Sequence, residues 1–292
     1  MTGRVVLVTG GSSGIGRAVA LRSARAGDQL VLLARGAPAL DEIAAECRRA
    51  GAASVLTLPT DVRDDDQVAA ALDRAVEAHG RVDLVAHCAG VAAYGRVEAI
   101  PAQVTDAVLD TNLGGTFNLA RHVLPLLRRQ RYGTLVIVGS VLGHIAVPTM
   151  SPYLVSKWGV RALTRALQLE NRDLGGVRVR YVAPGGVDTP IYRHAASFAG
   201  YLGAPPPPVA SADRVARAIL GPPRPARQVG IANNVIRLGY TVLPSLYDAL
   251  VGPLFRRFAT DGDTDLPATD GNVLEPHRAG QDVSADGSGA RP

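Results

Sequence analysis

Tyr153 and Lys157 stand four residues apart in a segment of helical character, so their side chains share one helix face. Lys157 is the single lysine among 31 basic residues. A tyrosine hydroxyl can exchange a proton with a substrate oxygen, but its ordinary pKa of about 10 is too high for this work at neutral pH. A nearby ammonium group favours the phenolate and lowers that pKa. The pair therefore indicates acid–base chemistry at Tyr153, supported by Lys157.

A glycine-rich turn indicates a phosphate site near the N-terminus. Thr9-Gly10-Gly11-Ser12-Ser13-Gly14-Ile15-Gly16 follows an apolar run and opens a helical segment. Glycines let the backbone approach a pyrophosphate closely, and a helix N-terminus offers it unpaired N–H groups. The expected contacts are Gly10, Ser12, Ser13, Gly14, Ile15 and Gly16.

The elements that must position these residues alternate along the chain. Short β-branched runs lie at residues 4–8, 29–34, 54–58, 82–86, 133–138, 177–182 and 228–231. Helical segments lie between them at residues 15–26, 37–50, 65–79, 104–131 and 152–174. Regular alternation with nearly continuous apolar strands predicts an α/β fold, a Rossmann-type doubly wound parallel sheet of about seven strands with helices on both faces.

Composition divides the chain into three parts. Residues 1–232 form the expected Rossmann-fold catalytic domain, which continues through a short helix at residues 211–220 with Ser211 as its N-cap. Residues 233–260 are apolar and predict two or three short helices, interrupted by Pro244 and Pro253. Residues 261–292 carry seven acidic side chains against two arginines and predict an acidic, disordered tail.

The T-G-x-x-x-G-x-G turn and the Y-x-x-S-K segment together resemble the single-domain short-chain dehydrogenase/reductase family. The resemblance implies a catalytic group of Ser140, Tyr153, Lys157 and Asn112. Tyr153 would exchange the proton, Ser140 would position the substrate oxygen, and Lys157 would also hold the nicotinamide ribose. Asn112 would support a water that connects Lys157 to solvent. Hydride then moves between a nicotinamide and a carbonyl or secondary alcohol.

The same resemblance implies further cofactor contacts, which follow the later strands. Asp61 and Val62 match the adenine contact, and Ala89-Gly90 matches the end of the family's N-N-A-G motif. The P-G motif and its downstream threonine are matched by Pro184, Gly185, Val187 and Thr189. His87 and Cys88 depart from the two asparagines that usually precede Ala-Gly. This departure puts local bracing in doubt, whereas the chemistry is unaffected.

The end of the second strand indicates the cofactor. NAD-selective sites place an acid there to bind the ribose 2′-hydroxyl. This chain has Ala34 followed by Arg35, whose guanidinium can pair with a 2′-phosphate. NADP(H) is therefore favoured over NAD(H), with Arg35 as the contact.

The expected substrate contacts are Ser140, Leu142, His144 and Tyr153, and the segments expected to face the substrate, at residues 91–94, 141–146 and 191–203, are mostly apolar. These predict an uncharged, fairly hydrophobic small molecule. Residues 235–258 have two interpretations: they cover the substrate cleft or a subunit interface, or they form a helix at a membrane surface with Arg256 and Arg257 as basic anchors.

Other functional classes are less consistent with the sequence. No zinc-ligand spacing and no basic stripe with interleaved aromatics is present, which disfavours metal and nucleic acid. The alternatives are a non-catalytic NADP-binding regulatory protein and an epimerase or dehydratase of the extended branch of the same superfamily. The apolar N-terminal run leads directly into glycines rather than a cleavage site, so a cytoplasmic protein is expected. By resemblance, it is expected to be a homodimer or homotetramer whose subunits pair through the helical segments at residues 104–131 and 152–174.

Overall fold

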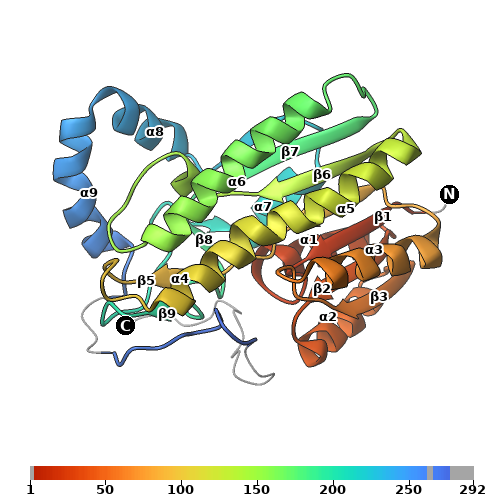
Figure 1. The fold of residues 1–292 in the computed structure, drawn as a ribbon, viewed down its shortest axis with the longest axis horizontal. Helices are drawn as coiled ribbons and strands as arrows, with labels where there is room; N and C mark the ends of the chain where they lie inside the picture. Colours follow the sequence, from red (N-terminus) through yellow and green to blue (C-terminus); the bar gives the residue numbers. More distant parts are fainter. Residues whose placement is uncertain (1–2, 262–265, 277–292) are drawn as a thin grey trace.

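A seven-stranded parallel sheet forms the centre of the computed structural model, which describes residues 3–261 and 266–276 (Figure 1). The strands follow the order β11-β7-β6-β4-β1-β2-β3, with the chain winding outward in both directions from β1. This is the doubly wound order in which ligands bind beyond the carboxyl ends of the strands. The strand bounds are β1 Val5–Thr9, β2 Gln29–Ala34, β3 Ser54–Pro59, β4 Leu84–His87, β6 Gly133–Val138, β7 Val177–Pro184 and β11 Ala226–Val229.

Helices cover both faces of the sheet, because successive strand residues point to opposite sides. Val5 and Leu7 of β1 join one core cluster, whereas Val6 and Val8 join the other. One face is covered by α1 Gly14–Arg25, α2 Ala37–Arg49 and α7 Ala212–Leu220. The other is covered by α3 Asp65–His79, α5 Gly115–Gln130 and α6 Ser151–Glu170. The predicted N-cap is confirmed, since the Ser211 side chain accepts from Arg214 N.

The single helix expected over residues 104–131 is divided in the structure. It consists of α4 Ala102–Leu109, a π-helical turn at Asp110–Gly114, and α5. π-Helical turns inside α-helices often occur at functional sites, and this one contains Asn112. The break depends on how the segment packs, which helical periodicity does not encode.

Shorter elements line the carboxyl edge of the sheet. The two-residue strands β5 Ala93–Tyr94 and β9 Ala196–Ser197 pair with each other, as do β8 Val187–Asp188 and β10 Ala210–Ser211. A 3-10 turn at Val141–Gly143 follows β6. These segments shape the mouth of the site.

The C-terminal region has the expected number of helices but differs from its prediction in two other respects. Residues 233–260 form two helices, α8 Asn233–Val242 and α9 Pro244–Phe258, and Pro244 begins the second as expected, but Pro253 lies inside α9 and does not interrupt it. Residues 266–276, expected to belong to a disordered tail, pack against the body, and Val273 is fully buried there. The rest of the predicted tail, beyond residue 276, lies outside the described residues.

Candidate active site

The predicted catalytic and cofactor residues converge at the carboxyl edge of the sheet. Gly10 follows β1, Gly90 follows β4, Ser140 follows β6 and Gly185 follows β7. All four line one cavity of about 750 Å³, together with Tyr153 and Lys157 of α6. A parallel sheet brings these strand ends together even though they are far apart in sequence.

The glycine-rich turn has the close packing that a pyrophosphate cradle requires. Gly10 has a φ of +62°, a backbone conformation that residues other than glycine rarely adopt. A Cβ at Gly16 would lie 2.1 Å from the carbonyl oxygen of Gly10, so any side chain at position 16 would clash with the main chain of the turn. Ser13, Gly14, Ile15 and Gly16 line the cavity. The turn therefore fits the phosphates of a dinucleotide at the N-terminus of α1.

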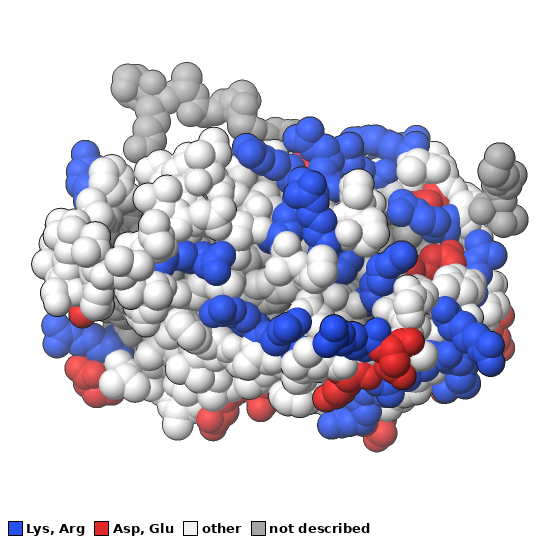
Figure 2. Space-filling view, turned by 90° about the horizontal axis from the view of Figure 1, so that it is seen from above, with Lys and Arg blue, Asp and Glu red and all other residues white. Residues whose placement is uncertain are grey.

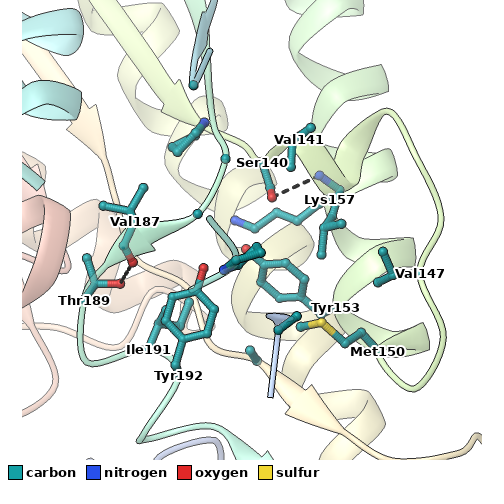
Figure 3. Close-up of a pocket in the computed structure, with 18 of the residues that line it drawn as sticks. Ser140, Val141, Val147, Met150, Tyr153, Lys157, Val187, Thr189, Ile191 and Tyr192 are labelled. Carbon is teal, nitrogen blue, oxygen red and sulfur yellow. Dashed lines mark hydrogen bonds between the residues drawn. The ribbon is translucent and has the colours of Figure 1, made fainter. Parts of the chain in front are cut away.

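Tyr153, Lys157 and Ser140 face the same space (Figure 3). The Lys157 Nζ atom lies 5.5 Å from the centre of the Tyr153 ring and donates to the carbonyl oxygen of Val138 at 3.3 Å. The Ser140 Oγ atom accepts from Leu142 N at 3.1 Å, which orients the hydroxyl at the start of the 3-10 turn. Lys157 is 5% exposed and Ser140 is 8% exposed, so both polar groups act in a largely dehydrated setting.

Burial dominates the protonation of the pair. It lowers the pKa of Lys157 to about 8 and raises the pKa of Tyr153 above its ordinary value, with Tyr192 adding to the rise and the Ser140 hydroxyl opposing it. The predicted lowering of the Tyr153 pKa by Lys157 is not found in this geometry, where only the Ser140 hydroxyl opposes the rise. The reason is that Nζ lies over the ring and bonds to Val138 rather than to the phenolic oxygen.

Asn112 is held firmly in the π-helical turn. Its Oδ1 accepts from Val91 N, and its Nδ2 donates to Val91 O and to the Ser156 hydroxyl, each at 2.9 Å. A Cβ at Gly90 would lie 3.1 Å from Asn112 Oδ1 and 3.5 Å from Lys157 Nζ. Gly90 thus leaves room for Asn112 and Lys157 to share one small space, consistent with the expected link between them.

His87 joins the glycine-rich turn to the π-helical turn. It is buried between Thr9 Oγ1 at 2.8 Å and Thr116 Oγ1 at 3.0 Å, and Thr116 donates onward to the carbonyl oxygen of Asn112. Burial, with a smaller contribution from the Lys157 cation, lowers the pKa of His87 to about 3. A neutral His87 therefore provides the bracing that the family's asparagine was expected to give, and Cys88 beside it lines the cavity.

The adenosine end of the predicted cofactor site is arranged differently from the expectation. The Arg35 guanidinium donates to the main-chain carbonyls of Asn272, Val273 and Leu274. Asp61 is paired with Arg63, and Val62 is buried beneath Gly115. Arg35, Asp61, Val62 and Ser12 lie beside the cavity but do not line it, whereas Asn272 does.

The other predicted contacts take the following places. Ala89, Pro184, Gly185, Val187 and Thr189 line the cavity, and Thr189 Oγ1 donates to Val187 O (Figure 3). Leu142 also lines it. His144 does not, because its ring lies against Tyr181 and its Nε2 bonds the Gln228 side chain at 3.0 Å.

Sequence reasoning missed one contributor to the site and covered another only by its segment. Tyr192 lies beside Tyr153 in the loop after the P-G motif, within residues 191–203 that were expected to face the substrate, but it was not named individually (Figure 3). Asn272 belongs to the segment that composition assigned to the tail. It has no local sequence signal.

Comparison with known proteins identifies the family. The short chain dehydrogenase family model matches residues 4–199. Sepiapterin reductase from Chlorobaculum tepidum is 35% identical over 195 residues, covering 64% of this chain and 79% of that protein. The chain therefore belongs to the short-chain dehydrogenase/reductase family, whose members are oxidoreductases that act on CH–OH groups with a nicotinamide cofactor.

Solved structures agree with this assignment. A short-chain dehydrogenase/reductase from Burkholderia phymatum, in complex with NAD, has a TM-score of 0.62 at 34% identity and covers 66% of this chain and 69% of its own. An alcohol dehydrogenase from Thermococcus sibiricus, complexed with 5-hydroxy-NADP, has a TM-score of 0.66 at 28% identity and covers 78% of this chain and 95% of its own. Similar proteins thus bind either nicotinamide dinucleotide.

Neither a metal site nor a membrane-spanning helix is found among the described residues. Within residues 3–261 and 266–276, His, Cys, Asp and Glu side chains form no group suited to a metal ion. None of the helices in those ranges has the length and apolarity that a membrane crossing requires.

Proposed function

We propose that the chain is an NADP(H)-dependent oxidoreductase that interconverts a carbonyl and a secondary alcohol on a fairly hydrophobic small molecule. The observation that carries this proposal is the placement of Tyr153, Ser140 and Lys157 in one cavity with the glycine-rich turn. Apart from these groups, the cavity near Tyr153 is mainly apolar, with Val141, Leu142, Ile145, Val147, Met150 and Ile191 among its lining residues.

Tyr153, Ser140, Lys157 and Asn112 each have a separate role in the proposed reaction. A bound nicotinamide dinucleotide supplies or accepts the hydride. Tyr153 gives its hydroxyl proton to the substrate oxygen during reduction and takes it back during oxidation. Ser140 donates a hydrogen bond to the same oxygen as negative charge develops there. Lys157, with a pKa of about 8, can return a proton toward Tyr153 near neutral pH, and Asn112 holds the adjacent backbone in place.

Replacement of Tyr153 by phenylalanine tests the reaction. We expect Tyr153→Phe to lower kcat by at least about a thousandfold, because the proton donor is lost while the ring remains. NADPH binding, measured by fluorescence titration, should stay within about threefold of wild type. A Tyr153→Phe protein with wild-type turnover on a carbonyl panel would refute the role, and binding without turnover by wild type would favour the regulatory alternative.

The cofactor preference rests on the end of β2. Ala34 offers no carboxylate to repel a 2′-phosphate, and Arg35 has five N–H donors, of which three meet the carbonyls of residues 272–274. The two remaining donors are enough for a charge-assisted pair with a phosphate.

Substitution of Arg35 tests this preference. We expect Arg35→Ser to raise the KM for NADPH about tenfold or more and to leave the KM for NADH nearly unchanged, because one charged hydrogen-bond pair is lost. Arg63→Ser is the matched control, since Arg63 lies nearby but is paired with Asp61. Equal KM values for the two cofactors in wild type would contradict the assignment.

A further inference from the structure

Helices α8 and α9 form an arch at one end of the molecule, away from the central sheet (Figure 1). They bury very little of themselves: only Asn233 of α8 and Phe255 of α9 are buried. The end of the molecule that carries them is mostly uncharged in Figure 2, where charged side chains lie mainly elsewhere. An arch of this composition leaves an apolar surface that the other described residues do not cover.

The arch is nevertheless fixed to the body at three places. At its start, Asn233 donates to the carbonyl oxygen of Ala183. At its middle, the Tyr247 hydroxyl donates to Ala146 O at 2.6 Å, and its ring stacks edge-on against Tyr240. At its end, Phe255 packs in a cluster with Tyr94 and Met150. These contacts hold the arch in a defined position over the body, so the space between them has a defined shape.

One stripe of α9 faces that space. Leu246, Leu250 and Leu254 recur at the four-residue spacing that places side chains on one helix face, and Leu243 directly precedes the helix. All four line the cavity that contains Tyr153, yet each remains 47–55% exposed. The helical stripe from Leu246 to Leu254 spans about 12 Å along the helix axis at 1.5 Å per residue. The cavity thus extends from the reacting groups into a long apolar trough.

The far part of the trough offers no partner for a charged group. Among the described residues that line the cavity, none is Asp, Glu or Arg, and Lys157 lies at the Tyr153 end. Apolar surface exposed in a cavity is stabilised when an apolar ligand removes it from water. This excludes a substrate with a charged group at the end remote from its carbonyl.

We propose that α9 forms a subsite for an extended aliphatic chain, so that the substrate is a ketone with a long apolar tail, or the matching secondary alcohol. The carbonyl lies at Tyr153 and Ser140, and the tail lies along Leu243, Leu246, Leu250 and Leu254. This inference rests on the proposed function for its reaction, whereas the subsite itself can be tested without turnover.

The same two helices provide a matched control. Val235 and Leu238 of α8 are 72% and 63% exposed and do not line the cavity. A Leu246→Gln/Leu250→Gln double variant changes the trough, and a Val235→Gln/Leu238→Gln variant changes the outer surface. Because all four side chains are exposed by about half or more, both variants should fold, which thermal unfolding checks.

The experiment compares 2-butanone, 2-hexanone, 2-octanone and 2-decanone with NADPH. In wild type we expect kcat/KM to rise by up to about fourfold per methylene group that enters the trough. The Leu246/Leu250 variant should lose at least tenfold on 2-decanone and less than twofold on 2-butanone, and the outer control should match wild type. A flat chain-length dependence in wild type, or an equal loss in both variants, would overturn the subsite.

A binding measurement separates this proposal from the proposed function. If wild type reduces none of these ketones, the Tm shift caused by 2-decanol is compared with that caused by 2-butanol. A shift by 2-decanol that is absent in the Leu246/Leu250 variant and kept in the outer control supports the subsite even without turnover. No shift in wild type, or the same shift in all three proteins, refutes it.

Discussion

His87 shows how a single buried side chain braces the site from behind. It lies between Thr9 and Thr116, and its pKa of about 3 means that it stays neutral in the folded protein at moderately acidic pH. In the unfolded chain the same imidazole takes up a proton near pH 6.5. Between these values the unfolded state binds more protons, so the free energy of unfolding falls as the pH falls.

This linkage predicts the effect of His87→Asn. The variant should be less stable than wild type near neutral pH by about 1–2 kcal/mol, because one of the two threonine hydroxyls loses its partner. From about pH 7 to about pH 4 wild type should lose roughly 3 kcal/mol more than the variant, because only wild type contains this histidine. Urea unfolding at both pH values measures the difference. Parallel losses in the two proteins would show that His87 is not held neutral.

The sequence predicted much of the site at this scale. The family resemblance implied Ser140, Tyr153, Lys157 and Asn112 as the catalytic group, and three of them line the cavity while Asn112 lies behind it. His144 was expected at the substrate, but its ring points to Gln228. Where a side chain points depends on neighbours from other elements, and Gln228 is 84 residues away.

At the scale of elements, residues 266–276 form what we call the C-terminal strap. Thr269 exchanges main-chain hydrogen bonds with Ser197, and Asn272 N donates to His194 O. Val273 is fully buried in a cluster with Val91, Ala93 and Val108. The strap thus joins the loop after the P-G motif to Arg35 at the end of β2.

A charge at Val273 should release the strap. In Val273→Asp a carboxylate would have to be buried without a partner, which costs several kcal/mol, so detachment is favoured. We expect faster amide hydrogen exchange at residues 269–274, with the global Tm changed by only a few degrees because the strap lies near the chain end. Ala268→Asp is the control, since Ala268 is exposed. Unchanged exchange in Val273→Asp would contradict this attachment.

Periodicity predicted the elements themselves well. The bounds expected for residues 29–34, 65–79 and 133–138 match β2, α3 and β6. The seventh strand was expected at residues 228–231, and β11 begins two residues earlier. The π-helical turn was missed, because its extra residue per turn is stabilised by packing rather than by local sequence.

At the scale of the whole molecule, α5 and α6 expose apolar side chains on the same face of the sheet. Phe117, Val155 and Leu169 are 47%, 55% and 53% exposed. These helices are the ones through which the sequence resemblance implied subunit pairing. A second copy of the chain would remove this surface from water.

We therefore expect a dimer or tetramer in sedimentation-velocity experiments. Phe117→Asp/Val155→Asp should shift the protein toward monomer, raising the dissociation constant by about a hundredfold or more, since two carboxylates would be buried at the contact. Val97→Asp should leave assembly unchanged, although Val97 is 72% exposed, because it lies outside α5 and α6. A monomeric wild type would rule out the pairing.

The sequence alone indicated the family and the parallel sheet, because the motifs are short stretches of chain and the sheet follows from a repeating pattern, and the family resemblance supplied the proposed catalytic group. Only the tertiary structure decided the partners of Arg35, the path of the strap and the trough beneath α9. Arg35 contacts residues that lie 237 to 239 positions further along the chain, and the Tyr247 hydroxyl contacts Ala146, which lies 101 positions away. Such contacts depend on how distant elements pack against one another in the folded protein, and neither composition nor local residue spacing encodes that packing.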